Sequence, residues 1–83
     1  MWRAKQQEGA GQGIERAPVE SSVIQSVGYD AEHAVLEIEF VSQQVYRYHF
    51  VPRSIWNGLM RAASKGRYFD TYIREKFPTA RLT

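Results

Sequence analysis

The feature that most constrains the fold is a change of hydrophobic period at Pro52. Before this proline, residues 45–50 alternate, with Tyr46, Tyr48 and Phe50 on one face of a predicted strand. After it, apolar residues recur at the three- and four-residue spacing of a helix. Proline lacks the amide hydrogen that a sheet needs but suits the first helical turn, so a strand ends and a helix begins here.

Two further strands are predicted upstream of this switch. Residues 23–29 form the first, in which Gly28 indicates either a bulge or a close approach of another backbone segment. Residues 34–40 form the second, whose alternation is typical of a strand with one buried face. Its apolar side chains are Leu36, Ile38 and Phe40, and its acidic side chains are Glu37 and Glu39.

The length of the turn decides how residues 34–40 pair with residues 45–50. A three-residue loop, 41–43, brings the aliphatic and aromatic faces to the same side and sets Glu37 opposite Arg47, a favourable pair. A two-residue loop would mix the faces, because a one-residue slip inverts every side chain. We therefore expect these partners: Phe40 with Gln44, Ile38 with Tyr46, and Leu36 with Tyr48.

Two helices are expected after the proline. The first carries apolar residues as far as Ala63, and Gly58 in its interior costs about 1 kcal/mol relative to Ala, which close backbone packing would explain. Lys65 and Gly66 indicate its C-terminal stop. The second helix ends at Pro78 and has an apolar stripe of Tyr68, Phe69, Tyr72, Ile73 and Phe77. This order predicts an α+β fold: a three-stranded antiparallel meander followed by two helices packed on one sheet face (βββαα).

The domain organisation follows from composition. Residues 1–20, rich in Gly and Gln, are predicted to be a disordered N-terminal tail in which Trp2 is free. Residues 21–78 form the one domain that 83 residues allow, and residues 79–83 form a C-terminal tail. The chain has no cysteine, which favours a reducing cytoplasm, and no run approaches the roughly 20 apolar residues of a membrane span.

Charge is divided between the two halves of the domain. Residues 20–44 carry five acidic residues and no Lys or Arg, whereas residues 45–83 carry eight basic residues and two acidic ones. The net charge of +2 therefore conceals an oriented field, which is typical of proteins with an anionic partner.

The motifs, taken together, resemble the KTSC domain family, which is named for the C-terminus of some lysyl-tRNA synthetases and also occurs as small stand-alone bacterial proteins. The matching segments are Val27-Gly28-Tyr29-Asp30, residues 36–40, Tyr46-x-Tyr48, Val51-Pro52 and residues 63–69. The likeness covers roughly residues 21–77, and its structural marks here are Tyr46, Tyr48, Pro52, Gly66, Tyr68 and Phe69. RNA binding is what the synthetase context implies. One departure is Gln43, where such domains commonly have a turn glycine, so Gln43 must bear some strain.

The Tyr46-x-Tyr48 motif invites an RNA interpretation, because some RNA-binding sheets stack bases on strand aromatics. The hairpin register favours a core role instead, since the tyrosines share a face with Leu36 and Ile38. The opposite face carries carboxylates that would repel phosphate. A nucleic-acid site is therefore expected on the helices, near the Ser64–Arg67 junction, with phosphate contacts from Arg53, Arg61, Lys65, Arg67 and Arg74.

The sequence is compatible with two alternative functions. The first is a small non-catalytic module that binds RNA, of tRNA-like type, through a basic helical face. The alternative is a protein-interaction module that self-associates through an open sheet edge, since residues 23–29 and 45–50 are both edges of a simple meander. No local sequence pairs a nucleophile with a base, so we expect no enzyme and no catalytic residue. Neither a cofactor, a metal nor a membrane contact is expected.

Overall fold

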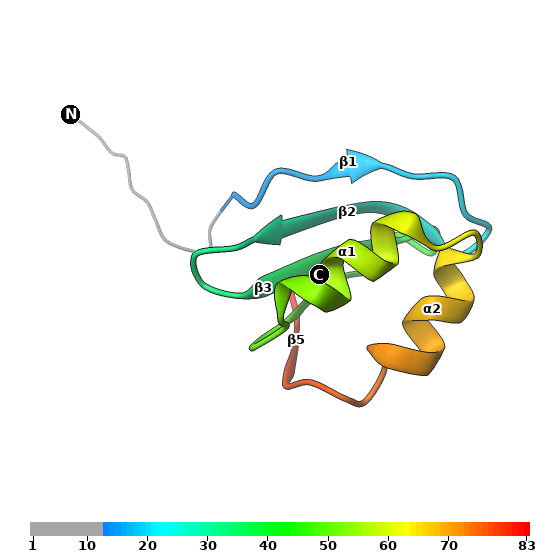
Figure 1. Ribbon diagram of the computed structural model, residues 1–83. Helices are drawn as coiled ribbons and strands as arrows, with labels where there is room; N and C mark the ends of the chain where they lie inside the picture. Colours follow the sequence, from blue (N-terminus) through cyan, green and yellow to red (C-terminus); the bar gives the residue numbers. More distant parts are fainter. Residues whose placement is uncertain (1–12) are drawn as a thin grey trace.

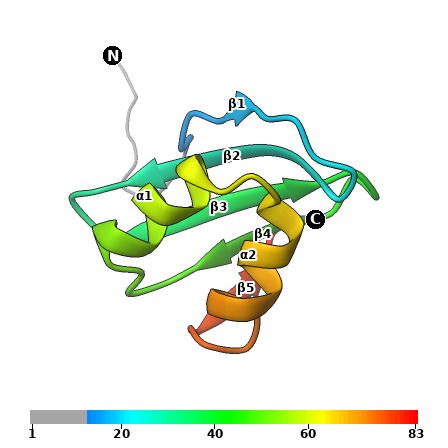
Figure 2. The ribbon, with the colours of Figure 1, turned by 45° about the vertical axis from the view of Figure 1, so that its right-hand side comes forward.

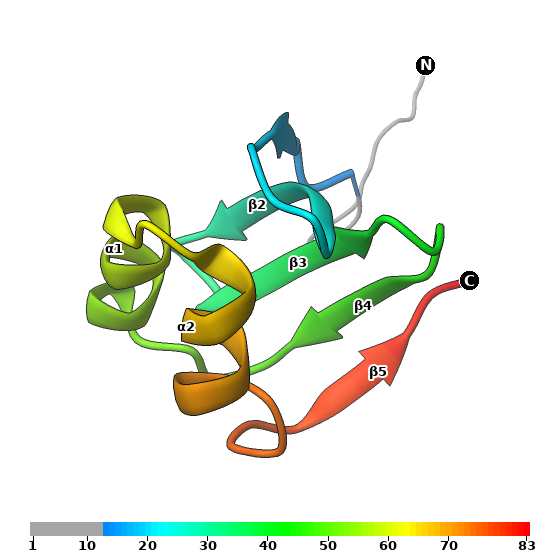
Figure 3. The same ribbon diagram turned by 90° about the vertical axis from the view of Figure 1, so that its right-hand side faces the viewer.

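A computed structural model describes residues 13–83 of the chain. It is an antiparallel sheet of five strands in the order β1-β2-β3-β4-β5, with two helices on one face (Figures 1 and 3). The elements are β1 (Ala17–Pro18), β2 (Ile24–Asp30), β3 (Val35–Phe40), β4 (Val45–Tyr48), α1 (Arg53–Arg61), α2 (Lys65–Tyr72) and β5 (Thr79–Arg81). The expected α+β class and helical layer are confirmed, but the predicted meander is only the centre of a wider sheet.

The hairpin of β3 and β4 has the predicted register. Leu36 pairs with Tyr48, and Ile38 pairs with Tyr46. The Phe40 amide donates to the Gln44 carbonyl at 2.8 Å, which closes the three-residue loop. Gln43 has a φ of +79°, so this residue does occupy the left-handed conformation that a glycine would adopt with less strain.

Both flanks of the meander are covered by short strands that the sequence did not predict. Residues 13–20 include β1, which pairs with β2, and residues 79–81 form β5, which pairs with β4. The predicted tails are therefore wrong for these segments, while residues 1–12, with Trp2, lie outside the described residues. The prediction that residues 23–29 and 45–50 form the sheet edges is also wrong, because β1 and β5 are the outermost strands (Figure 2). These edge strands have two and three residues. Very short edge strands protect a sheet against edge-to-edge pairing.

The core lies between the sheet and the helices. Tyr48 belongs to it, and Tyr46 packs against it while partly buried, so the predicted core role of these tyrosines is confirmed. The Tyr48 and Phe69 rings meet edge to face at 5.7 Å, a favourable aromatic geometry. The buried core cluster consists of Ile24, Val27, Leu36, Ile38, Tyr48, Val51, Leu59, Phe69 and Ile73.

Pro52 marks the strand-to-helix switch as expected. It precedes α1 with an extended backbone, φ −69° and ψ 154°. The residue two positions earlier contradicts the strand pattern: Phe50 does not share the tyrosine face but is 75% exposed, with a φ of +61°. The chain turns here because the amides of His49 and Val51 donate to Pro78 and Ala34 outside β4, and this turn points Phe50 away from the core.

Two glycines lie where another segment approaches closely. A Cβ on Gly58 would lie 2.1 Å from the Tyr68 hydroxyl, so the predicted close packing at Gly58 is the contact between α1 and α2. A Cβ on Gly28 would lie 2.3 Å from the Glu15 carbonyl oxygen. Of the two alternatives for Gly28, the close approach is therefore correct, and the irregularity in β2 falls between Ile24 and Ser26.

Within residues 13–83, neither helix is long and apolar enough to cross a membrane.

Candidate phosphate-binding groove

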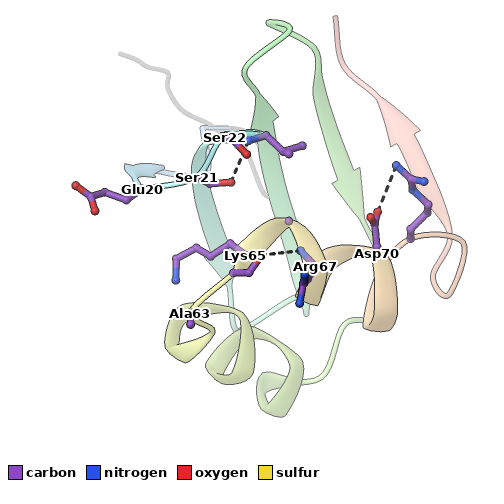
Figure 4. A pocket seen from close by; sticks show the side chains of 11 residues that line it. Glu20, Ser21, Ser22, Ala63, Lys65, Arg67 and Asp70 are labelled. Carbon is purple, nitrogen blue, oxygen red and sulfur yellow. Dashed lines mark hydrogen bonds and ion pairs between the residues drawn. The ribbon is translucent and has the colours of Figure 1, made fainter.

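A groove of about 480 Å³ opens where α1 gives way to α2, at the junction that the sequence indicated. One wall is the loop between β1 and β2, with Glu20, Ser21 and Ser22, and the other is the start of α2 (Figure 4). Ser21 shapes the loop wall, because its hydroxyl accepts hydrogen bonds from the amides of Val23 and Ile24 at 3.1 Å each. The charged lining residues are Glu20, Lys65, Arg67, Asp70 and Arg74.

Lys65 has a structural task at this junction. The sequence predicted that Lys65 and Gly66 end the first helix, and this prediction is wrong. The first helix ends at Arg61, and both residues belong to the first turn of α2. The Lys65 ammonium donates to the carbonyls of Leu59, Met60 and Ala62, each at 3.1 Å. These carbonyls lie at the end of α1, where, within residues 13–83, only that of Leu59 also accepts a backbone amide, from Ala62, and an ammonium there is favourable. Its three donors are thereby used.

Arg67 is the cation of the groove that remains available. Ser64 is the N-cap residue immediately before α2. Its hydroxyl accepts a hydrogen bond from the Arg67 amide at 3.3 Å. The Arg67 side chain is exposed and forms no ion pair within residues 13–83. Its guanidinium carries five donors in a planar fork that suits phosphate oxygens.

Arg74 lines the groove but already has two partners. Its guanidinium lies 3.4 Å from the Asp70 carboxylate and 5.8 Å from the centre of the Phe69 ring. Asp70 therefore neutralises part of the basic patch, at Arg74. Both ion-pair side chains are more than half exposed, so an added phosphate competes with a weak surface pair.

The remaining predicted contacts, Arg53 and Arg61, lie on α1 outside the groove lining. They are exposed at opposite ends of the helix, eight residues apart. Lys65 does not continue the surface of α1 that carries Arg61, because Ala62 takes an extended backbone and ends the helix. The structure therefore gathers Lys65, Arg67 and Arg74 in the groove and leaves two arginines on the neighbouring helix.

The outer face of the sheet is occupied by an internal ion cluster. Arg16 and Arg47 both bind the Glu37 carboxylate, Arg47 with its Nε at 2.7 Å. Arg16 also donates to the Ser26 hydroxyl at 3.1 Å, and Ser26 in turn donates to Glu39 at 2.8 Å. The pairing of Glu37 with Arg47 is as predicted. Arg16 was missed, since an arginine in a polar N-terminal segment gives no signal of a partner in β3.

The pKa of Tyr48 reflects the burial of the Tyr46-x-Tyr48 motif. Burial raises the pKa of Tyr48 to about 12, and the neighbouring Tyr46 adds to this effect while Arg74 opposes it. A tyrosine in this environment stays neutral at physiological pH and serves as packing.

Asp30, Glu32 and His33 form the turn between β2 and β3, and their potential ligand atoms lie within 4.8 Å of one another. Asp30 accepts hydrogen bonds from the amides of Glu32 and His33, and its Oδ2 lies 2.7 Å from His33 Nδ1. The hydrogen bond from His33 lowers the pKa of Asp30 below 3.8, and the same bond raises the pKa of His33 above 6.5. The cluster is explained as an ion-paired turn.

The Asp30–His33 pair should stabilise the turn most between about pH 4 and pH 6.5. The raised His33 pKa gives a contribution that is present below pH 6.5 and is lost as the pH rises through the folded value. The lowered Asp30 pKa gives one that is lost as the pH falls below 3.8 through the folded value. An NMR titration should show the His33 pKa falling towards 6.5 in Asp30→Asn. Equal titration curves in the two proteins would contradict the pair.

The fold and the groove together describe a small α+β domain with a single sheet and a helical layer that carries exposed arginines. Residues 20–77 match the family model of the KTSC domain. The chain therefore belongs to the KTSC domain family, and the resemblance noted in its sequence is confirmed.

Three relatives illustrate how such domains occur. A KTSC domain protein from Yersinia pestis, known from a crystal structure, is 42% identical, with a TM-score of 0.82 over 86% of this chain and 100% of that one. An uncharacterised protein of Stutzerimonas stutzeri is 42% identical over 74% of this chain and 86% of its own length. A lysine–tRNA ligase of Nostoc punctiforme is 41% identical over 77% of this chain, which spans only 11% of that ligase.

Proposed function

We propose that the domain is a non-catalytic RNA-binding module that contacts phosphates through its helical layer. The observation that carries the proposal is the separation of charge by layer. The carboxylate of Glu37 is held by two arginines on the outer face of the sheet. On the helical side, Arg53, Arg61 and Arg67 are exposed and form no ion pair within the described chain. The cationic side chains that are available to bind a polyanion therefore lie on the helices.

The kinship with a stretch of lysine–tRNA ligases supports RNA as the anion. Those enzymes act on tRNA by name, and a domain shared with them fits an accessory RNA contact. Lys65 is left out of the proposed contact set, because its three donors bind carbonyls of α1. The proposed phosphate contacts are therefore Arg53, Arg61, Arg67 and, once displaced from Asp70, Arg74.

A non-catalytic role fits the histidines. His33 is engaged with Asp30 in an exposed turn, and no serine or threonine hydroxyl within residues 13–83 is hydrogen-bonded to a histidine. Activation of a hydroxyl nucleophile requires such a base. We also place the protein in the cytoplasm, since a chain without cysteine fits a reducing compartment.

RNA affinity should fall with salt in proportion to the number of phosphate contacts. Three to four contacts on a single strand predict a log–log slope of about −2 to −3, and Arg61→Gln or Arg67→Gln should each reduce its magnitude by about 0.7. Fluorescence anisotropy with a labelled single-stranded RNA and a tRNA transcript, between about 50 mM and about 200 mM salt, measures this slope.

The control for this titration is Arg81→Gln, which removes the same charge from β5 and not from either helix. It should leave the slope unchanged. If neither RNA binds at low salt, the proposed function is wrong. If Arg81→Gln weakens binding as much as Arg61→Gln, the charge matters only through the net field and the helical site is wrong.

A further inference from the structure

A pair of tyrosines lies on α2, and the second of them is not accounted for by the core. The Tyr68 and Tyr72 rings, one helical turn apart, lie with their centres 4.7 Å apart at an angle of 40°. Tyr68 packs against the core, but Tyr72 is 51% exposed and is not part of the packed cluster. The core contact of this helix is instead made by Phe69 and Ile73.

The first tyrosine of the pair is fixed against α1. Its hydroxyl lies so close to Gly58 that any Cβ there would clash, so the Tyr68 ring reaches the backbone of α1 (the helices lie side by side in Figure 3). Arg61 is the last residue of α1 and lies at its junction with α2, whereas Tyr72 is the last residue of α2. Tyr68 therefore anchors the pair to α1, and Tyr72 lies at the end of α2 that points away from the junction.

We infer that Tyr72, backed by Tyr68, is a stacking surface for an unpaired RNA base, within a helical layer whose exposed arginines contact the phosphates. This inference rests on the proposed function and adds to it the state of the RNA that is bound. Proteins that hold single strands combine cationic side chains along the backbone with aromatic rings that stack on bases. The helical layer offers both features. In an RNA duplex the base faces are already stacked on one another, so they could not stack on Tyr72.

The position of Tyr72 also favours a nucleic acid over a protein partner. The two helices carry the exposed Arg53, Arg61 and Arg67, which complement a polyanion, and the single carboxylate of the two helices, Asp70, is paired with Arg74. Phe50 is a useful contrast, because it is even more exposed at 75% but lies in the loop between β4 and α1. Exposure alone would make Phe50 the better stacking residue, while the present inference assigns that role to Tyr72.

The test is anisotropy with a single-stranded RNA and an otherwise identical strand that carries abasic sites. Tyr72→Ala should weaken binding of the intact strand by about 5- to 150-fold, while Tyr72→Phe, which keeps the ring, should bind like the wild type. Phe50→Ala should also bind like the wild type. The salt slope should be the same in all four proteins, because no phosphate contact changes. On the abasic strand the difference between Tyr72→Ala and wild type should vanish.

The possible failures can be told apart. If wild-type protein binds RNA with the expected salt slope but Tyr72→Ala binds equally well, the stacking surface is overturned and the proposed function stands. An equal loss in Phe50→Ala would also overturn it. If no RNA binds at any salt concentration, the proposed function fails, and the stacking role with it. If Tyr72→Ala changes the sedimentation coefficient, the helical face is a contact between copies of the chain, which overturns the inference.

Discussion

Glu37→Gln should lower the free energy of unfolding by about 3 kcal/mol, the largest effect that we expect of a single polar substitution here. The Glu37 side chain is only 5% exposed and accepts from the guanidinium groups of Arg16 and Arg47. The substitution keeps the shape but removes the negative charge, which leaves two partly buried cations facing each other. Such a loss is a large part of the stability of a domain of this size. Urea unfolding followed by circular dichroism measures it.

The matched control is Glu39→Gln, two residues along the same strand. Its carboxylate is 29% exposed and lies 3.9 Å from Arg16, so its removal should cost less than about 1 kcal/mol. The two variants should also differ in hydrogen exchange at Val19, whose amide bonds to Gln25 next to β1. Exchange there should accelerate in Glu37→Gln, because Arg16 then loses its main anchor. Equal stability of the two variants would show that the cluster contributes no more than a surface pair.

Gly58→Ala should destabilise the protein by about 1–3 kcal/mol, although alanine is the better helix former. The new methyl group would lie 2.1 Å from the Tyr68 hydroxyl and 2.6 Å from the adjoining ring carbon. The ring must therefore move away from α1, which disturbs the contact between the helices and the stack of Tyr68 on Tyr72. Thermal or chemical unfolding of the variant gives the size of this loss.

The sign of the Gly58→Ala effect should reverse when Tyr68 is also replaced. In a Tyr68→Ala background the clash is gone, and only the helix propensity remains, worth up to about 1 kcal/mol in favour of alanine. A double-mutant cycle isolates this coupling. Asn57→Ala, at an exposed neighbouring position of α1, should change stability by less than about 0.5 kcal/mol. Destabilisation of similar size in both backgrounds would mean that Gly58 is required for some reason other than Tyr68.

Much of the candidate site could be located from the sequence. The junction at residues 64–67 does line a groove, to which Arg74 also contributes as expected. The role of Lys65 could not be foreseen, because it depends on where α1 ends. Helix propensity varies little from residue to residue, so the exact end of a helix is weakly encoded, and a shift of a few residues turned an expected phosphate contact into a cap.

The centre of this protein follows from local patterns in its sequence. Alternation fixed which faces of β3 and β4 meet the helices, the hairpin register followed from that, and Pro52 set the switch to α1. The edges of the sheet and the ion pairs on its surface depend on long-range contacts that no local pattern encodes. Strands of two and three residues are too short to show a period, and the partner of Arg16 lies 21 residues away in β3. Local periodicity reports burial, while edge pairing and ion clusters depend on which distant segments come together.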